Sequence, residues 1–173
     1  MCNIFLIGFM GCGKSSVAAE LEKSYEMQVR EMDRMIADRA QMSITQIFET
    51  HGEEYFRDLE TELLVEIGDG SNQVVSCGGG VVLRQDNVVK MKQSGHIVLL
   101  TANAETILAR VSKDDNRPIL KGKKTIQDIS ELMEKRRQKY EMAADIVIET
   151  DGKSICEICE EVISKLKKEN RDV

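Results

Sequence analysis

Short apolar runs alternate along the chain with longer amphipathic segments. The runs are rich in β-branched residues and almost continuously apolar, which is typical of parallel strands buried on both faces. The alternation predicts an α/β fold, a parallel sheet wrapped by helices, with ligands bound at the carboxyl ends of the strands. The five runs are residues 3–8 (NIFLIG), 27–32 (MQVREM), 73–77 (QVVSC), 96–101 (HIVLLT) and 144–149 (ADIVIE).

Polar residues mark where several of the intervening helices should begin. Ser43 is followed three residues later by Gln46, and Ser154 by Glu157, the spacing of a capping box. Asn103 has the side chain of an N-cap for the helix that follows it. These residues predict three helix starts between the strands.

One segment, residues 112–124 (SKDDNRPILKGKK), fits neither pattern. It is polar and basic, and it contains Pro118, the only proline of the chain. Long irregular segments of compact domains often act as lids over a site. A solvated loop is the alternative, and the sequence leaves both open.

The composition argues against several classes of protein. With 173 residues, 42% hydrophobic and 31% charged, the chain is sized for a single domain, residues 1–173. No apolar run approaches the roughly 18 residues of a membrane span. The first residues lack the basic region of a signal peptide, so we expect a cytoplasmic protein with no membrane partner. We also expect the protein to be a monomer. The net charge of −6 and the lack of a basic arm argue against nucleic acid as a partner.

The five cysteines are expected to be reduced thiols, because their number is odd and no secretory signal is expected. Cys156 and Cys159 have the spacing of a metal or redox pair, but they lie in a segment with the pattern of a helix. We expect Cys159 to belong to its apolar stripe, which is formed by Ile155, Ile158, Cys159, Val162, Ile163 and Leu166. A zinc site needs four ligands, and the chain offers no second Cys pair and only two histidines. The structural interpretation is favoured.

The first apolar run ends in a glycine-rich loop. Gly8-x-x-x-x-Gly13-Lys14-Ser15 matches the Walker A pattern at every fixed position. In such a loop, backbone N–H groups cradle phosphates, the lysine reaches the β- and γ-phosphates and the first serine holds Mg²⁺. A plain glycine turn is disfavoured because the motif follows a strand and opens a helix. The ATP-binding residues predicted here are Gly11, Cys12, Gly13, Lys14, Ser15 and Ser16.

The loop alone does not say what becomes of the phosphate. Switch GTPases, motor ATPases and small-molecule kinases all use it. The chain lacks an Asn/Thr-Lys-x-Asp guanine-reading motif, and its third apolar run ends without the carboxylate of a Walker B strand. The question is therefore whether the chain contains an acceptor pocket.

Two groups of residues after the strands could line such a pocket. Glu31 and Asp33 lie at the end of the second run. Because residues two apart on a strand point to the same face of the sheet, we expect the two carboxylates to lie close together. One could orient or deprotonate an acceptor hydroxyl, and the other could hold a Mg²⁺-bound water. Gly78, Gly79 and Gly80 follow the third run and would let the backbone approach a ligand closely. Solvated charges and a flexible loop are the alternatives.

Two arginines supply a third feature. Arg57 and Arg136 lie in different amphipathic segments. A guanidinium binds a carboxylate through two parallel hydrogen bonds, so a pair of them would clamp a small acid. Taken singly, each arginine also fits an ordinary surface charge.

Together these motifs resemble those of the shikimate kinases. The resemblance extends from Asn3 to about Lys167, and GE-x-x-FR-x-x-E, GGG and RP-x-L in that order are its most specific parts. It implies a P-loop kinase fold of the nucleoside-monophosphate-kinase type, with five parallel strands in the order 2-3-1-4-5 flanked by helices. It also implies a lid at about 112–124 and an acceptor-binding helical region at about 33–60. The motifs are GFMGCGKSS, REMD, IFETHGEEYFRDLE, SCGGG, DDNRPIL and EKRRQKY.

The resemblance implies ATP-dependent phosphorylation of the 3-hydroxyl of shikimate, in the chorismate pathway to aromatic amino acids, with Mg²⁺ as cofactor. Lys14, Asp33 and Arg117 would be catalytic, with Asp33 holding the acceptor hydroxyl and Arg117 reaching the phosphates from the lid. Arg110 would contact adenine, Ser15 would bind Mg²⁺ directly and Glu31 through water. The shikimate-binding residues would be Asp33, Arg57, Gly78, Gly79, Gly80 and Arg136.

Two positions depart from the family pattern. Glu31 stands where the family usually has aspartate, which leaves the geometry of the Mg²⁺-bound water open. Residues 150–154 (TDGKS) lack the usual Arg or Pro that packs on adenine, and Lys153 is a weak candidate for that role. A kinase for another small polyol acid, such as gluconate, and a non-catalytic nucleotide-binding module are the alternatives. Intact Lys14 and Asp33 argue against the second.

Overall fold

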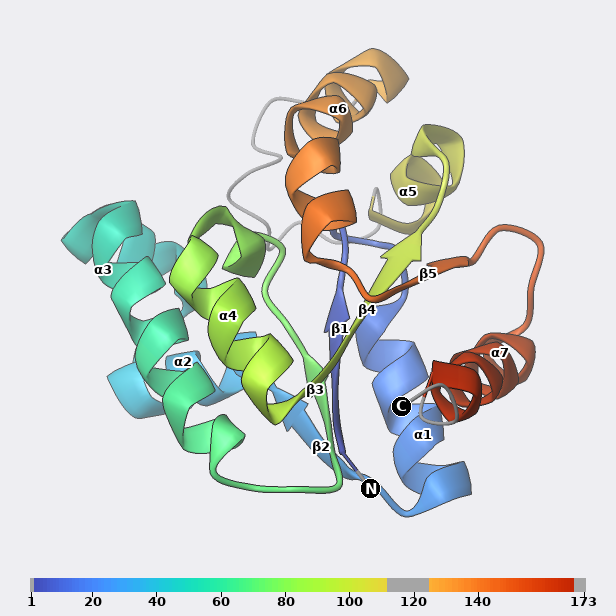
Figure 1. Ribbon diagram of the computed structural model, residues 1–173. Coiled ribbons are helices and arrows are strands. Elements are labelled where there is room, and N and C mark those ends of the chain that lie inside the picture. Colours follow the sequence, from blue (N-terminus) through green and yellow to red (C-terminus); the bar gives the residue numbers. More distant parts are fainter. Residues whose placement is uncertain (1, 112–124, 170–173) are drawn as a thin grey trace.

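An open, five-stranded parallel sheet lies at the centre of the molecule, in the strand order β2-β3-β1-β4-β5 (Figure 1). The computed structural model describes residues 2–111 and 125–169. In the central strand, Phe5 lies beside Val75 on one side and Ile97 on the other. The fold class and strand order expected from the sequence are confirmed. The strands are β1 (Asn3–Ile7), β2 (Gln28–Glu31), β3 (Gln73–Ser76), β4 (Gly95–Thr101) and β5 (Ile146–Glu149).

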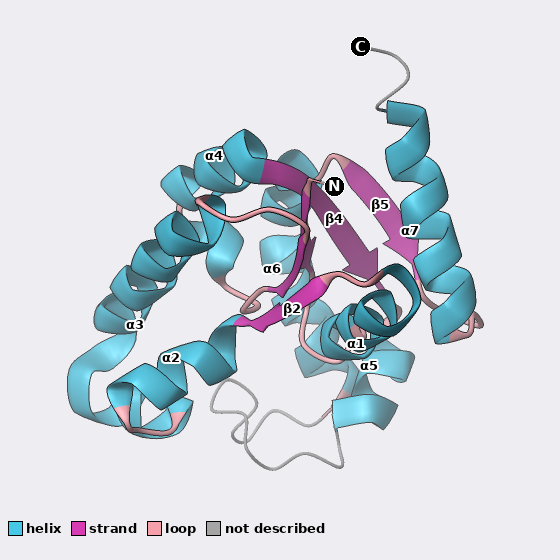
Figure 2. Ribbon diagram, turned by 90° about the horizontal axis from the view of Figure 1, so that it is seen from below, coloured by secondary structure: helices cyan, strands magenta, loops and turns pink. Residues whose placement is uncertain are grey.

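Helices cover both faces of the sheet (Figures 1 and 2). Helices α1 and α7 pack together on one face and α3 and α4 on the other, while α5 and α6 lie together beyond the carboxyl end of β4. Within residues 2–111 and 125–169, no helix has the length and apolar character that a transmembrane segment requires. The helices are α1 (Lys14–Tyr25), α2 (Met32–Ala40), α3 (Ile44–Gly68), α4 (Gln85–Ser94), α5 (Ala104–Val111), α6 (Ile126–Ala143) and α7 (Ile155–Glu169), with a 3₁₀ turn at Val81–Leu83.

The sheet separates two apolar cores, because successive strand residues point to opposite faces. Ile4 and Leu6 of β1 belong to the core under α1 and α7, whereas Phe5 and Ile7 belong to the core under α3 and α4. All four side chains are almost fully buried. The near-continuous apolar character of the first run follows from this burial on both sides.

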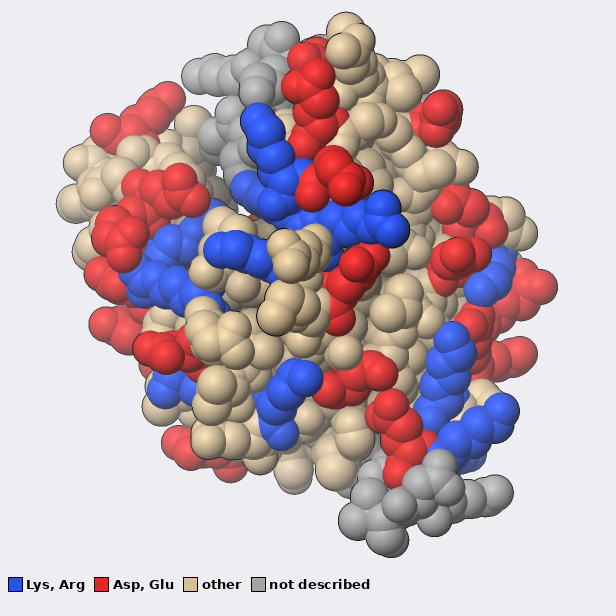
Figure 3. Space-filling view, turned by 45° about the horizontal axis from the view of Figure 1, so that its top comes forward, with Lys and Arg blue, Asp and Glu red and all other residues tan. Residues whose placement is uncertain are grey.

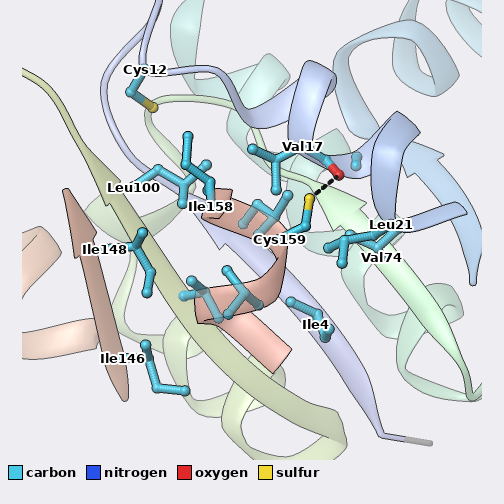
Figure 4. Packing of buried hydrophobic residues seen from close by; sticks show 14 of the residues in the cluster. Ile4, Cys12, Val17, Leu21, Val74, Leu100, Ile146, Ile148, Ile158 and Cys159 are labelled. Atoms are coloured by element: carbon cyan, nitrogen blue, oxygen red, sulfur yellow. Dashed lines mark hydrogen bonds between the residues drawn. The ribbon is translucent and has the colours of Figure 1, made fainter. Parts of the chain in front are cut away.

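The Cys156/Cys159 pair belongs to helix packing. Cys159 is buried in the core between α7 and α1, where its thiol donates to the carbonyl of Val17 at 3.7 Å (Figure 4). Cys156 is exposed. In the described parts of the chain, no group of three or more Cys, His, Asp or Glu side chains is placed to hold a metal. The prediction that Cys159 belongs to the apolar stripe of a helix is confirmed, whereas Cys156 lies outside that stripe.

The three helix starts predicted from polar residues are confirmed. Ser43 and Gln46 exchange hydrogen bonds at the start of α3, each side chain accepting from the other's backbone N–H. Ser154 and Glu157 do the same at α7. The Asn103 side chain accepts from an N–H in the first turn of α5 at 2.8 Å. Such contacts satisfy N–H groups that the helix itself leaves unpaired.

Helix α3 is interrupted at Gly52, whose φ of 83° and ψ of 174° are not helical. Glycine adopts positive φ without the steric penalty of a side chain. The helix resumes at Glu53 and packs against α4. Its second part carries Arg57 and Glu60 to the carboxyl end of β3, where they contact the glycine turn at residues 78–80.

Candidate active site

The phosphate loop connects the end of β1 to the first turn of α1. Gly8, Gly11 and Gly13 all have positive φ, at 138°, 80° and 99°, values that other residues rarely adopt. Gly8 also lies against the carbonyl of Leu100 in β4, where a Cβ would collide. Helix α1 begins directly after the loop, at Lys14. Its unpaired N–H groups and positive dipole end therefore face the loop, an arrangement that binds phosphate.

The Lys14 side chain folds back over this loop. Its Nζ donates hydrogen bonds to the carbonyls of Gly8 at 2.9 Å and Phe9 at 3.2 Å, and lies 3.9 Å from the Cys12 Sγ. An ammonium group has three donors and no acceptor. Lys14 can therefore exchange carbonyl oxygens for phosphate oxygens without leaving the loop.

Ser15 links the loop to the ends of two strands. Its hydroxyl donates to a Glu31 carboxylate oxygen at 3.1 Å and lies 3.3 Å from the Ser76 hydroxyl. Three oxygen-bearing side chains thus meet beside the loop, and oxygen is the ligand type that Mg²⁺ prefers. Ser76 was not anticipated as a site residue. Its one sign in the sequence was a polar residue after the two valines of the run QVVSC.

Asp33 does not lie on a strand, and the prediction that it shares a strand face with Glu31 is wrong. Strand β2 ends at Glu31, and Asp33 is in the first turn of α2, where the helix dipole favours an acidic residue. The chain turns into the helix at Met32, so strand alternation stops there. Asp33 and Glu31 nevertheless line the same cavity, of about 310 Å³, together with Lys14 and Ser15.

The three glycines form a tight turn after β3 against which charged side chains pack. A Cβ on Gly78 would collide with the Glu60 carboxylate and lie 2.9 Å from an Asp33 oxygen, and one on Gly80 would collide with the Arg57 guanidinium. Gly79 has more room, its nearest neighbours being 3.8 Å away. At Gly78 and Gly80, the missing side chain makes space for charged side chains of the protein itself.

Arg57 is buried between two carboxylates. Its Nη1 donates to Glu60 at 2.5 Å and its Nη2 to Glu53 at 2.8 Å. Although burial opposes it, the two acids raise the pKa of Arg57 above its ordinary value. Burial raises the pKa of Glu60 from 4.5 to about 7, against the opposing effect of Arg57. The sequence analysis missed Glu60 as a site residue, although it is the last fixed residue of GE-x-x-FR-x-x-E.

Arg136 approaches the same turn from α6. Its Nη1 donates to the Gly79 carbonyl at 3.2 Å, and the Tyr140 hydroxyl donates to the same oxygen. Burial raises the pKa of Tyr140 to about 12, which keeps it a neutral donor. The structure thus brings Arg57 and Arg136, from helices far apart in the sequence, to neighbouring glycines. Tyr140 was not anticipated as a site residue, although it is the last residue of the motif EKRRQKY.

Arg110 completes the described part of the site. Its Nη1 donates to the Gly11 carbonyl at 3.0 Å, and its side chain lines the same cavity as the phosphate loop. Lys153 instead pairs with Glu161 of α7 at 2.5 Å and does not line that cavity. Arg117 and the segment 112–124 expected to form a lid lie outside the described residues.

The Cys12 side chain is buried within the loop. The residue is 1% exposed, and it lines a second cavity of about 340 Å³ with Phe9, Met133 and Tyr140. This cavity lies against the end of β4 and one side of α6. The Cys12 Sγ is also 3.9 Å from the Lys14 Nζ.

Basic side chains collect on the face above the carboxyl ends of the strands. Figure 3 shows Lys and Arg gathered across the upper middle of that face, with Asp and Glu beside them. The whole chain has a net charge of −6. A locally basic area raises the concentration of anions near it, even on a protein whose net charge is negative.

The sequence matches the family model of the shikimate kinases over residues 10–167. Curated relatives include a shikimate kinase of Caldanaerobacter subterraneus subsp. tengcongensis, 40% identical over 94% of this chain and 95% of that protein. Another, from Geobacter sulfurreducens, is 41% identical over 92% of this chain and 88% of its own length.

Solved structures agree with these matches. The shikimate kinase of Acinetobacter baumannii, determined in complex with shikimate, superposes with a TM-score of 0.92 at 30% identity, covering 98% of this chain and 94% of that one. The shikimate kinase of Aquifex aeolicus superposes with a TM-score of 0.83 at 35% identity, covering 97% and 98% of the two chains.

Proposed function

This chain belongs to the shikimate kinase family, and on that premise we propose that it transfers the γ-phosphate of ATP to the 3-hydroxyl of shikimate. One observation carries the residue assignment. The phosphate loop, Asp33 and the glycine turn held by Arg57 and Arg136 lie at one end of the sheet. Donor and acceptor can therefore bind side by side.

The phosphate side of the site is built from the loop. Backbone N–H groups bind the phosphate oxygens, and Lys14 turns from the Gly8 carbonyl toward the β- and γ-phosphates. Ser15 and Glu31 have the oxygen donors to hold Mg²⁺, Ser15 directly and Glu31 through water. The bound ion would neutralise charge on the phosphates. Arg110, which donates to the Gly11 carbonyl, would contact the adenine of the nucleotide.

The acceptor side is built from α2, α3, α6 and the glycine turn. Asp33 accepts a hydrogen bond from the 3-hydroxyl and orients it toward the phosphate, and it is the group available to take the hydroxyl proton. Arg57 and Arg136 bind the carboxylate. Gly78, Gly79 and Gly80 bring the backbone close to the ring. Catalysis then consists of positioning and charge neutralisation, the usual means of phosphoryl transfer.

A coupled ADP-release assay with shikimate, with gluconate and with no acceptor tests this function. ADP release that depends on shikimate is the expected result. Release with gluconate alone would assign another polyol acid, and none with any acceptor would indicate a nucleotide-binding module. These outcomes separate the three functions that the sequence permits.

We also infer that the enzyme acts as a monomer in the cytoplasm and supplies the chorismate pathway. All five cysteines are free thiols, which is typical of a reducing compartment. Gel filtration with light scattering tests the monomer, and complementation of a strain lacking shikimate kinase tests the pathway. A stable dimer or a failure to complement would contradict the respective inference.

A further inference from the structure

Glu60 is a buried acid that lies against the glycine turn of the proposed acceptor site. It is 0% exposed, and one of its carboxylate oxygens, Oε2, accepts from Arg57 at 2.5 Å. The other oxygen, Oε1, is buried and has no hydrogen-bond partner among the described residues. Ionisation of a buried carboxylate with an unpaired oxygen costs free energy, because protein hydrogen bonds replace only some of those it would make with water.

Charged and titratable groups reach Glu60 from each element packed around it. Burial has the largest effect on the pKa of Glu60 and raises it. Attraction to Arg57 and, more weakly, to Arg84 lowers this pKa, whereas repulsion by Asp33 raises it. Arg84 is itself paired with two acids of α3. The groups are Asp33 of α2, Glu53 and Arg57 of α3, Cys77 after β3, Arg84 before α4 and, through the Gly79 carbonyl, Arg136 and Tyr140 of α6.

Arg57 forms ion pairs with two carboxylates that differ in their exposure to solvent. The Glu53 side chain is 59% exposed and pairs with Nη2, so it can leave the guanidinium and return to water. The Glu60 side chain is 0% exposed and cannot move away from Arg57 into water. When a third carboxylate arrives, Glu53 can be displaced, whereas Glu60 must stay beside the new negative charge.

Resting on the proposed function, in which Arg57 binds the shikimate carboxylate, we propose that Glu60 takes up one proton from solvent when shikimate binds and releases it when the product leaves. The proton adds to a Glu60 carboxylate oxygen, no other bond forms or breaks, and the net charge of the pocket is conserved. Arg57 then serves the substrate carboxylate alone. Glu60 is thus a positioning residue whose protonation state follows the occupancy of the acceptor site.

An Asp33 oxygen lies on the same side of Gly78 as the unpaired oxygen of Glu60. Both the Glu60 Oε1 and the Asp33 oxygen lie against Gly78, where a Cβ would stand. The charge of Asp33 is one of the influences that raise the pKa of Glu60. Protonation of Glu60 would therefore weaken the repulsion between these two acids.

The proton is available near neutral pH. Burial raises the pKa of Glu60 to about 7, which brings its titration close to neutral pH. A substrate carboxylate on Arg57 raises that pKa further, because it adds negative charge in a desolvated site. Linkage then requires shikimate to bind more weakly as the pH rises above neutrality.

Isothermal titration of the enzyme with shikimate, in phosphate and in Tris at the same pH, measures this proton directly. The two buffers differ in ionisation enthalpy, so the difference in binding heat gives the protons taken up. We expect proton uptake on binding at both pH 7 and pH 8, with more protons taken up at pH 8, where more of the empty sites are ionised. Shikimate methyl ester, which lacks the negative charge, should bind with almost no uptake.

Two matched variants assign the proton to a residue. Glu60→Gln keeps the shape and an oxygen for Arg57 but cannot titrate, so uptake should vanish. Glu53→Gln alters the other carboxylate on the same guanidinium and should keep the uptake. Undiminished uptake in Glu60→Gln, or equal uptake with the ester, overturns the inference. If Glu60→Gln does not fold, the wild-type and ester titrations still decide.

Failure of the proposed function looks different. Shikimate that binds and is phosphorylated, with buffer-independent heats at pH 7 and pH 8, overturns the proton uptake alone. An enzyme that neither binds nor phosphorylates shikimate overturns the proposed function, and this inference with it.

Discussion

The Ser15 hydroxyl donates a hydrogen bond to the Glu31 carboxylate at 3.1 Å, joining the phosphate loop to the end of β2. The Ser15 hydroxyl thus lies beside Glu31, the residue that stands where the family pattern has aspartate. The longer glutamate side chain therefore still reaches the loop. In the function proposed above, Ser15 would bind Mg²⁺ directly and Glu31 through water, and this contact holds the two side chains next to each other.

Changing Glu31 should alter the magnesium dependence more than the acceptor chemistry. Mg²⁺ keeps several of its waters, so an acid acting through water can shift with limited loss. We expect Glu31→Asp to remain active and Glu31→Gln to need several-fold more Mg²⁺, whereas Asp33→Asn should be at least about 100-fold slower, because it removes the group that holds the hydroxyl. Turnover against Mg²⁺ concentration separates these effects. Equal inactivity of Glu31→Gln and Asp33→Asn, unrelieved by excess Mg²⁺, would contradict the division of roles.

Arg136→Ala should weaken shikimate binding and leave ATP binding nearly unchanged. It removes a charge-assisted contact worth roughly 1.5–3 kcal/mol, so the KM for shikimate should rise about 10- to 100-fold. Arg137→Ala is the matched control, because Arg137 is 63% exposed and pairs with Glu134 and Glu141. Both Michaelis constants should be measured for each variant. A change confined to the KM for ATP would show that the carboxylate clamp is misassigned.

The position of Cys12 changes what alkylation should do. Cys2 and Cys156 are exposed and should react quickly with iodoacetamide without loss of activity. Cys12 is buried within the loop, so its modification should be slow, inactivating and delayed by ATP. Mass spectrometry of the modified peptides against residual activity checks this order. If Cys12→Ala is inactivated as fast as the wild type, inactivation proceeds through another residue.

Glu60 should make folding stability depend on pH. Its pKa is raised from 4.5 to about 7 in the folded state, so the folded protein binds more protons between these values. The free energy of unfolding should therefore fall as the pH rises from about 4.5 to about 7, by up to roughly 3 kcal/mol, and then level off. Glu60→Gln should lack this component. Urea unfolding of both proteins at pH 5 and pH 8 measures it, and parallel pH dependences would contradict the assignment.

The sheet and the phosphate loop could be read from the sequence because their causes are local. Burial of a strand on both faces leaves an apolar run, and a loop with positive φ at three positions requires glycine, as at Gly8, Gly11 and Gly13. The capping residues are equally local, since Ser43 and Gln46 satisfy each other within one turn.

The arrangement of the acceptor residues was harder to predict, because it depends on contacts between segments that are distant in the sequence. Asp33 was placed on a strand because nothing in REMD shows that the helix begins one residue after Glu31. Glu60 reads as an ordinary helix acid until folding buries it against Gly78 and Arg57. Tyr140 reaches Gly79 across 61 residues of sequence, and no local pattern specifies such a contact.

The position of the phosphoryl group on the product tests the account most directly. Enzyme, MgATP and shikimate are incubated together, and the product is examined by phosphorus–proton correlation NMR. Because Asp33 orients one hydroxyl while Arg57 and Arg136 fix the carboxylate, we predict a phosphorus signal coupled to the proton on carbon 3. Phosphorus coupled to another ring proton, or inorganic phosphate as the sole product, would contradict the arrangement of acceptor and phosphate loop described above.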